Sequence, residues 1–183
     1  MNVELAPPSQ HGPGNARLLI VEPSRSALGV LAKRLGEAGY RIIACDAGDA
    51  MAEMLRAPVD LVLAELRMTP VSGVELTRRI RDDVALKDTP VILITGRSDS
   101  AGAVDGFGAG ADDVVAKPFH FEVLAARIAR RIARARAIRE LLSDNATLDA
   151  RVVTRAIELG ETRAALRQSE AERLRLEQLF RRA

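Results

Sequence analysis

At 183 residues, the chain has room for one domain of ordinary size and one additional segment. With no tryptophan, one tyrosine and four phenylalanines, its core must be built mainly from aliphatic side chains. No apolar run reaches the ~18 residues that a membrane helix needs, and a single cysteine excludes an internal disulfide and a cysteine-based zinc site. We therefore expect a cytoplasmic protein without a membrane partner.

Charge is distributed unevenly along the chain. From Glu122 to the end, 14 Lys and Arg stand against 9 Asp and Glu, whereas the preceding 121 residues hold 13 against 16. This asymmetry indicates a mildly acidic domain followed by a basic helical segment. Residues 1–15 contain three prolines and two glycines, with no basic start or apolar stretch, so they predict a loose tail and not a signal peptide.

Short apolar runs then alternate with longer amphipathic ones, which is typical of successive βα units around a parallel sheet. The predicted strands are Arg17–Val21, Arg41–Ala44, Asp60–Ala64, Pro90–Thr95 and Asp113–Ala116. The predicted helices between them are Ser24–Ala38, Asp49–Arg56, Gly73–Asp82 and Asp99–Gly108. Because the strands are nearly continuous apolar runs, we expect helices to cover both faces of the sheet.

Four polar side chains follow or end these strands: Glu22, Glu65, Thr95 and Lys117. The carboxyl ends of parallel strands meet at one edge of the sheet, where ligands gather in open α/β folds. Carboxylates there are suited to Mg²⁺, and a lysine and a hydroxyl are suited to the charge of a phosphoryl group. The pattern therefore indicates a site related to phosphoryl transfer onto a carboxylate.

From Phe121 onward, the spacing of apolar residues predicts helix, with a polar break at Ser143–Thr147 and a second helix from about Leu148 to Phe180. A thin apolar stripe on this segment predicts an imperfect coiled-coil seam through which the chain forms a homodimer. The seam residues are Leu141, Leu148, Val152, Leu159, Leu166 and Phe180.

Several of these pieces, in this order, resemble the receiver domain of two-component response regulators over Ala16–Leu142. The pieces that carry the resemblance are Gly39–Tyr40, Pro58–Glu65, Ser72–Leu76, Pro90–Gly96, Gly106–Asp113 and Lys117–Phe119. The resemblance implies a flavodoxin-like (βα)5 fold, a doubly wound parallel five-stranded sheet, over residues 16–142. Residues 143–183 would form a helical coiled-coil and dimerisation segment. The resemblance also implies a regulatory module with a histidine kinase or a downstream signalling domain as partner. An enzyme is not expected, because no catalytic nucleophile, base or cofactor loop appears elsewhere in the sequence.

The resemblance is incomplete at the pocket. Receivers usually carry two adjacent acids after the first strand, where this chain has Glu22 and Pro23, and an aspartate acceptor, where it has Glu65. Val114 occupies the position of the switch aromatic, three residues before Lys117. Fewer and longer carboxylates predict weak Mg²⁺ binding at Glu22 and Glu65 at most, and no cofactor is expected. These changes favour a pseudo-receiver that acts by protein contacts and not by phosphorylation.

Alternatives remain open at this point. Glu65 either mimics a phosphorylated aspartate or simply pairs with Lys117. The chain could instead be a phosphorylatable receiver in a phosphorelay that feeds an output domain. A DNA-binding regulator that uses the basic helix is a further alternative, although an arginine-rich helix more often presents a solvated face, so we do not expect nucleic acid as a partner. The C-terminal stretch is also similar to helical linkers that enter PAS or other signalling domains, so it is either such a linker or a free-standing coiled coil.

Overall fold

The computed structural model describes residues 15–180, except for the side chains of 172, 174 and 176–180. The predicted N-terminal tail therefore lies almost entirely outside the described residues, and so does the side chain of Phe180. Two compact units are present, Met1–Arg136 and Ala137–Ala183. No helix of the described part has the length and apolar character needed to cross a membrane.

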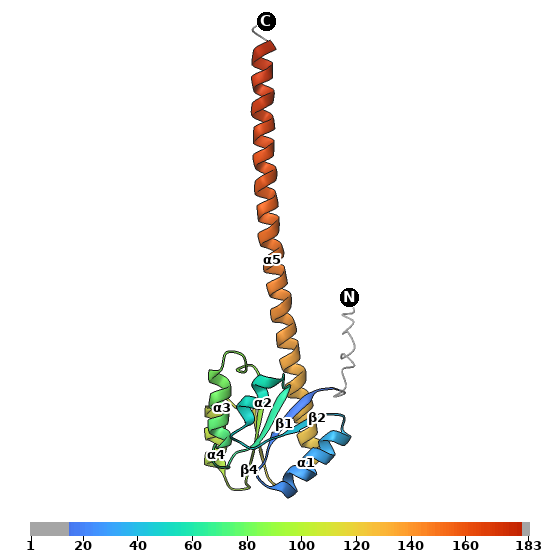
Figure 1. Cartoon of the computed structure of the whole chain (residues 1–183), viewed down its shortest axis with the longest axis vertical. Coiled ribbons are helices and arrows are strands. Elements are labelled where there is room, and N and C mark those ends of the chain that lie inside the picture. Colours follow the sequence, from blue (N-terminus) through green and yellow to red (C-terminus); the bar gives the residue numbers. More distant parts are fainter. Residues whose placement is uncertain (1–14, 181–183) are drawn as a thin grey trace, which may run out of the picture. The chain divides into compact units, whose positions relative to one another are not determined.

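Five strands form one parallel sheet in the first unit, in the order β2-β1-β3-β4-β5 (Figure 1). The strands are β1 (Arg17–Val21), β2 (Arg41–Ala44), β3 (Leu61–Glu65), β4 (Val91–Thr95) and β5 (Asp113–Ala116). The helices that connect and follow them are α1 (Arg25–Glu37), α2 (Ala50–Arg56), α3 (Gly73–Asp82), α4 (Ser100–Gly108) and α5 (Phe121–Phe180). This topology confirms the predicted doubly wound, flavodoxin-like sheet followed by a long C-terminal helix.

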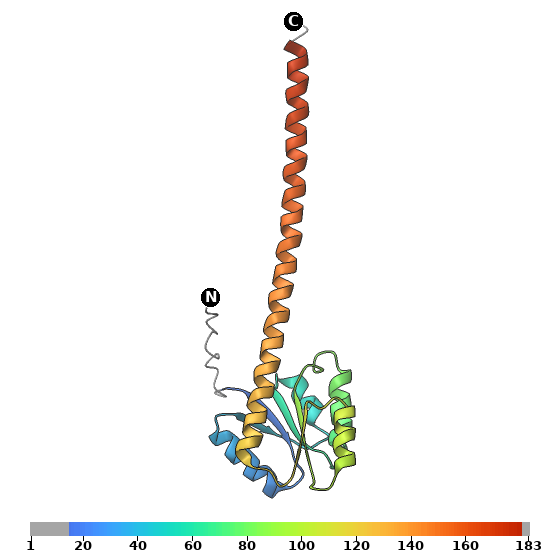
Figure 2. The ribbon, with the colours of Figure 1, turned by 180° about the vertical axis from the view of Figure 1, so that it is seen from behind.

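Both faces of the sheet are covered, as continuous apolar strands require. On one face, α2 and α3 contribute Met54, Leu76 and Ile80 to a core cluster with Leu19 and Leu93. On the other face, α1 and the first turns of α5 pack over the sheet, as the reverse view shows (Figure 2). Their buried side chains are Leu31, Leu35, Leu124, Ile128 and Ile132. The first unit therefore has the complete core of a domain.

Ser24 and Asp99 were predicted as first helical residues and act as N-caps instead, and Ser72 caps a helix that begins at Gly73 as predicted. Ser24, Ser72 and Asp99 accept hydrogen bonds from the backbone N–H groups three residues ahead of them, at 3.3, 3.1 and 3.0 Å. At the ends of α1 and α4, Gly39 and Gly110 have φ values of 91° and 95°, a conformation that favours glycine. These local signals explain why the helix bounds agree with the predictions to within a residue or two.

The predicted break at Ser143–Thr147 is wrong, because α5 runs through this segment. The Thr147 hydroxyl donates to the Ser143 carbonyl at 2.9 Å, so the polar side chain bonds within the helix instead of capping a new one. Ser, Asp and Asn also cost only a few tenths of a kcal/mol each in a helix interior, roughly, and the segment has neither Gly nor Pro. N-cap residues without a breaker were therefore a misleading signal.

Candidate functional site

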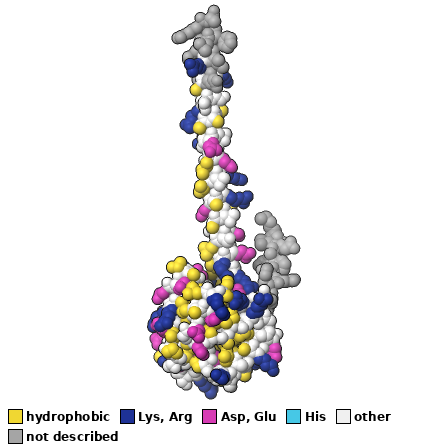
Figure 3. All heavy atoms as spheres, viewed as in Figure 1, with side chains coloured by type: hydrophobic (Ala, Val, Ile, Leu, Met, Phe, Trp, Pro, Cys, Tyr) yellow, Lys and Arg dark blue, Asp and Glu magenta, His cyan; other side chains and the backbone are white. Residues whose placement is uncertain are grey.

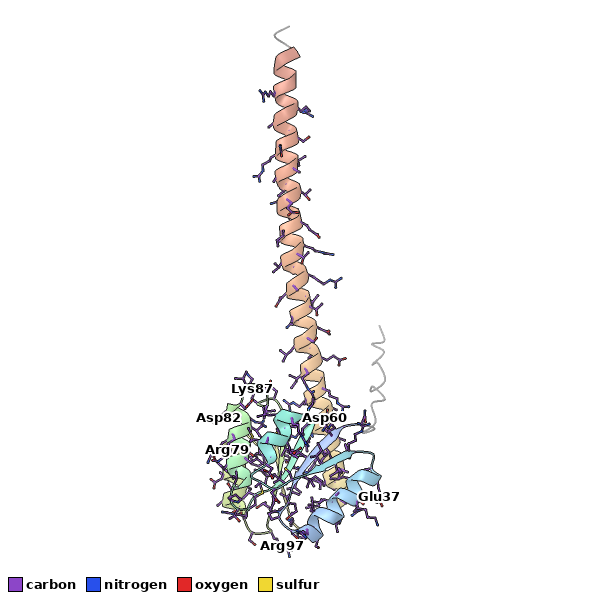
Figure 4. All side chains as sticks on the ribbon, viewed as in Figure 1. Glu37, Asp60, Arg79, Asp82, Lys87 and Arg97 are labelled. Carbon is purple, nitrogen blue, oxygen red and sulfur yellow. The ribbon has the colours of Figure 1, made fainter. Side chains whose placement is uncertain are left out.

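The carboxyl edge of the sheet brings the predicted polar residues to one side of the first unit. Glu22 follows β1, Glu65 ends β3, Thr95 ends β4, and Lys117 follows β5. The two edges are separated in Figure 4: Arg97, two residues after β4, lies at the bottom, whereas Asp60 and Lys87, which precede β3 and β4, lie at the top. Because the strands are parallel, the candidate site residues that end or follow a strand lie at the same edge of the sheet as Arg97.

Lys117 bridges the two glutamates. Its Nζ lies 2.6 Å from Glu65 Oε2 and 3.0 Å from Glu22 Oε2. The side chains of Glu22 and Glu65 are only 5% and 13% exposed, and that of Lys117 is 38% exposed. Burial acts to lower the pKa of Lys117, but hydrogen bonds and charge from Glu65 and Glu22 outweigh it, so the pKa is raised above its ordinary value. One ammonium group therefore bridges both acids of the pocket and offsets one of their two negative charges.

The remaining oxygen of Glu22 is also engaged. Glu22 Oε1 accepts a hydrogen bond from the backbone N–H of Ser24 at 2.9 Å. Pro23 between them is exposed and has no side-chain oxygen. Both carboxylate oxygens of Glu22 are thus bonded, one to the Ser24 backbone and one to Lys117. The second acid that receivers carry next to this position is replaced by Pro23.

A divalent cation fits this donor set poorly. Mg²⁺ requires near-octahedral oxygen ligands, whereas each glutamate has an oxygen bonded to the Lys117 ammonium group. Within residues 15–180, as far as side chains are described, no group of three or more His, Cys, Asp or Glu is arranged to hold a metal ion. The residues present do not form the carboxylate cluster that the family's Mg²⁺ would need.

Thr95 lies at the same edge, but its hydrogen bond is made to Asp99 and not to either glutamate. The buried Thr95 hydroxyl makes a long hydrogen bond of 3.4 Å to Asp99 Oδ2. Asp99 is also held by Arg67, whose Nε and Nη2 donate to its two oxygens at 2.7 Å each. Chiefly through the hydrogen bond from Arg67, the pKa of Asp99 is lowered to about 2. Thr95 thus belongs to a second polar cluster, with Asp99 and Arg67.

This second cluster was missed by the sequence reasoning. Asp99 was included in a predicted helix, and no role was predicted for Arg67. An N-cap signal at Asp99 was available, because Asp is a preferred capping residue before an apolar helix. Nothing in the local sequence indicated that Arg67, 32 residues earlier, would form a two-point ion pair with it.

Val114 lies on β5 opposite Leu93 of β4 and packs against the core cluster that contains Leu93. It is partly buried and has neither a hydroxyl group nor a ring. Gly106 of α4 packs close by, since a Cβ there would lie 2.9 Å from Leu93 Cδ1 and 3.4 Å from Val114 Cγ2. The switch position is therefore part of ordinary aliphatic packing between α4 and the sheet.

Several arginines of the basic helix are engaged within the first unit. Arg127 Nη1 lies 2.9 Å from both carboxylate oxygens of Asp113, and Arg131 lies 3.7 Å from the same carboxylate. Arg136 pairs with Asp60, labelled in Figure 4, at 3.2 Å. Such pairs are consistent with a helix face that is anchored to its own domain, and they offer no support for a nucleic-acid interface.

In the second unit, the predicted seam residues are exposed. Apolar side chains recur along this helical segment in the space-filling view (Figure 3). The exposed fractions of Leu141, Leu148 and Val152 are 68%, 55% and 66%, and those of Leu159 and Leu166 are 53% and 58%. The described residues show this stripe but no partner for it, so the homodimer stays a prediction.

Comparison with known proteins agrees with the geometry. The family described as the response regulator receiver domain matches residues 18–129. The chain is 35% identical to the transcriptional regulatory protein DltR of Streptococcus agalactiae over 124 residues, which cover 67% of the chain and 54% of that protein. It is 37% identical over 113 residues to the two-component response regulator PhoP of Pseudomonas aeruginosa, covering 61% and 49%.

A solved receiver-domain structure also resembles this chain. The signal receiver domain of a signal transduction histidine kinase from Syntrophus aciditrophicus matches with a TM-score of 0.60 and 31% identity, covering 64% of this chain and 90% of that one. The chain spans about half the length of the curated relatives it matches. With the family match covering more than half of its residues, the chain belongs to the response regulator receiver domain family.

Proposed function

We propose that this chain is a pseudo-receiver: a cytoplasmic, non-enzymatic signalling module that acts through protein contacts and is not switched by phosphorylation. The observation that carries the proposal is the Lys117 bridge, with Nζ at 2.6 Å from Glu65 and 3.0 Å from Glu22. An acceptor carboxylate that is tied to a cation and lacks a metal cluster is poorly placed to attack a phosphodonor. The receiver fold is kept, while the pocket serves as an internal ion-pair network.

The same contacts favour the simpler role for Glu65. A phosphate mimic acts by drawing the Thr95 hydroxyl toward negative charge at the acceptor position. Here the Thr95 hydroxyl bonds to Asp99, and Asp99 is held by Arg67. Val114 adds no aromatic group that could follow a movement of Thr95. Glu65 thus acts as a partner of Lys117 in a fixed pocket.

The proposed output is homodimerisation through the C-terminal helical segment, with a histidine kinase or a downstream signalling domain as a further partner. Relatives such as DltR and PhoP are named as regulators, and this chain matches about half of each. A receiver without a phosphate switch transmits information by its contacts alone, and the exposed apolar stripe beyond Arg136 is a surface suited to such contacts.

Restoring the missing acids tests the proposal. The Pro23→Asp, Glu65→Asp double variant should bind Mg²⁺ in calorimetric titration, because it regains two short carboxylates beside Glu22. The unaltered chain should show no saturable binding at Mg²⁺ concentrations that saturate the variant. A Pro23→Ala, Glu65→Gln double variant is the matched control for the loss of the native residues. Comparable Mg²⁺ binding by the unaltered chain would contradict the proposal.

A further inference from the structure

The helical segment beyond Arg136 contains a heptad pattern that bears on the orientation and register of a dimer. With Ile138 at an a position, the described a residues are Ile138, Asn145, Val152, Leu159 and Leu166. The corresponding d residues are Leu141, Leu148, Arg155, Thr162 and Ser169. Five consecutive core layers, from 138 to 152, thus read Ile, Leu, Asn, Leu, Val.

These five layers have the composition of a parallel two-stranded coiled coil. Ile138 and Val152 are β-branched residues at a, and Leu141 and Leu148 occupy d, which is the combination that favours two strands. The exposed fraction of Ile138 is 47%, so it too is available for a partner helix. A second copy of the same segment supplies the complementary knobs and holes.

Asn145 is the polar member of this core. In a parallel dimer without offset, Asn145 meets Asn145 of the second copy, and the two side-chain amides can hydrogen-bond to each other. A shift by one heptad would place each amide against Ile138 or Val152, where it would be buried without a partner. A single Asn at an a position thereby selects one register at a cost in stability.

Charged residues at the e and g positions, which flank the core, also affect the stability of this dimer. In a parallel dimer, Glu158 at g faces Arg163 at e of the second copy, which is a favourable pair. Asp144 at g faces Asp149 at e, which is unfavourable and flanks Asn145 directly. Among the five layers from 138 to 152, those around Asn145 are therefore the weakest, and the apolar layers on either side must hold them together.

A second apolar stripe offers an alternative seam. Leu142, Val153 and Ile157 lie on other faces of the helix, with small residues such as Ala146 and Ala150 between the first two. Leu142 and Val153 are 11 residues apart with no large apolar side chain of this stripe between them. The stripe therefore lacks the alternating spacing of three and four residues that a coiled-coil seam needs. The face that contains Asn145 is the one with consecutive large apolar layers.

We propose that residues 137–171 form a parallel, in-register coiled coil with a second copy of this chain, and that Asn145 sets the register. This inference rests on the homodimerisation in the proposed function and adds the orientation, the register and the residue that determines them. Asn145 thus makes the dimer less stable than an apolar residue would, but it favours a single register.

Disulfide trapping in the full chain tests orientation. In a Cys45→Ser background, Leu141→Cys and Arg155→Cys are each placed at d, where a parallel in-register dimer brings equal positions within the ~7 Å between Cα atoms that a disulfide spans. Both single-cysteine variants should cross-link to dimers. An antiparallel dimer can cross-link at only one of the two. Ala150→Cys, at the outward f position, is the matched control and should stay uncross-linked; cross-linking there in preference to 141 and 155 would overturn the proposal.

Register is tested by mixing two single-cysteine chains. Leu141→Cys mixed with Leu148→Cys forms a heterodisulfide only when one helix slips by seven residues. With Asn145 present, this product should be scarce. Adding Asn145→Val to both chains should tighten the dimer by roughly tenfold and make the heterodisulfide abundant. Equal heterodisulfide yields with Asn145 and with Val would overturn the role of Asn145.

Sedimentation of the unaltered chain distinguishes failure of the homodimer from failure of its inferred alignment. A monomer at tens of micromolar, roughly the range that a weak coiled coil requires, contradicts both the homodimer and its register. A dimer that fails to cross-link at both 141 and 155 contradicts only the inferred alignment. A monomeric chain that still lacks Mg²⁺ binding would leave the pseudo-receiver pocket standing without its proposed output.

Discussion

The two units of this chain use the same aliphatic residues in opposite ways. In the receiver unit, Ile92 and Leu93 of β4 are completely buried, and every residue of that strand belongs to the interior. In the C-terminal unit, Leu141 and Val152 are 68% and 66% exposed on a helix. The receiver unit buries the apolar residues of its central strands, whereas the C-terminal unit presents an apolar stripe that a monomer leaves in water.

We propose that this difference places regulation in the C-terminal unit. A domain with a closed core and a pocket fixed by ion pairs has few parts that a phosphoryl group could move. A helix with an uncovered stripe gains stability only by association, so its state depends on the concentration and identity of its partner. Substitutions in each unit should therefore have different effects.

The largest effect is expected from the core. Leu93→Ala should lower the free energy of unfolding of the receiver unit by about 2–5 kcal/mol, because it opens a cavity in a buried strand. Val152→Ala should leave that value within about 0.5 kcal/mol and weaken dimerisation instead. Tyrosine fluorescence during urea unfolding reports on the receiver unit, since Tyr40 is the only tyrosine and is buried there. Equal effects of both changes would break the comparison.

The next effect concerns the pocket. Lys117→Met leaves Glu22 and Glu65 together without their cation, and should destabilise the receiver unit by about 1–3 kcal/mol, less than for a fully buried pair because Lys117 is 38% exposed. Lys87→Met, on an exposed loop at the opposite edge, is the matched control and should be nearly neutral. Calcium or magnesium rescue of the Lys117 variant would show that the pocket can hold a metal after all.

A pair of glycines compares tight packing with open space. A Cβ at Gly73 would lie 2.6 Å from the Glu65 carbonyl oxygen and 2.9 Å from Leu93, so Gly73→Ala should cost about 1–3 kcal/mol. Gly160 has no atom within 4 Å of such a Cβ, and Gly160→Ala should strengthen its helix by up to about 1 kcal/mol. Thermal unfolding followed by circular dichroism measures both. Two changes of the same sign would contradict the packing difference.

The smallest effect is a pH dependence. The pKa of Asp99 is about 2 in the folded chain, below its ordinary value of 3.8. A lowered carboxyl pKa stabilises the fold above pH 3.8, and this contribution is lost as the pH falls toward 2. Asp99→Asn should flatten this part of the stability profile between pH 4 and pH 2. An unchanged profile in the variant would show that the bond from Arg67 contributes nothing.

The sequence predicts which residues share the site but not how they pair. Glu22, Glu65 and Lys117 were placed together because each follows an apolar strand, and parallel topology puts such residues at one edge. Which partner each chooses depends on side-chain positions that topology does not determine. The bond from Thr95 to Asp99 and the two-point pair with Arg67 needed the course of the loops after β3 and β4.

The C-terminal segment shows a different limit. Ser143, Asp144 and Asn145 are common cap residues, so a local reading placed a break among them. Their place in the heptad frame shows instead that Asn145 falls in the seam and Asp144 beside it. Local propensity and long-range periodicity disagreed here, and the continuous helix follows the periodicity.

The most direct test of the pseudo-receiver is chemical. The full chain is incubated with acetyl phosphate and Mg²⁺ and examined by intact mass spectrometry, next to its Pro23→Asp, Glu65→Asp variant. We predict that the unaltered chain keeps its mass while the variant gains a species heavier by about 80 Da, the mass of one phosphoryl group. A stoichiometric gain of that mass by the unaltered chain would contradict the central claim and return it to the phosphorylated receivers.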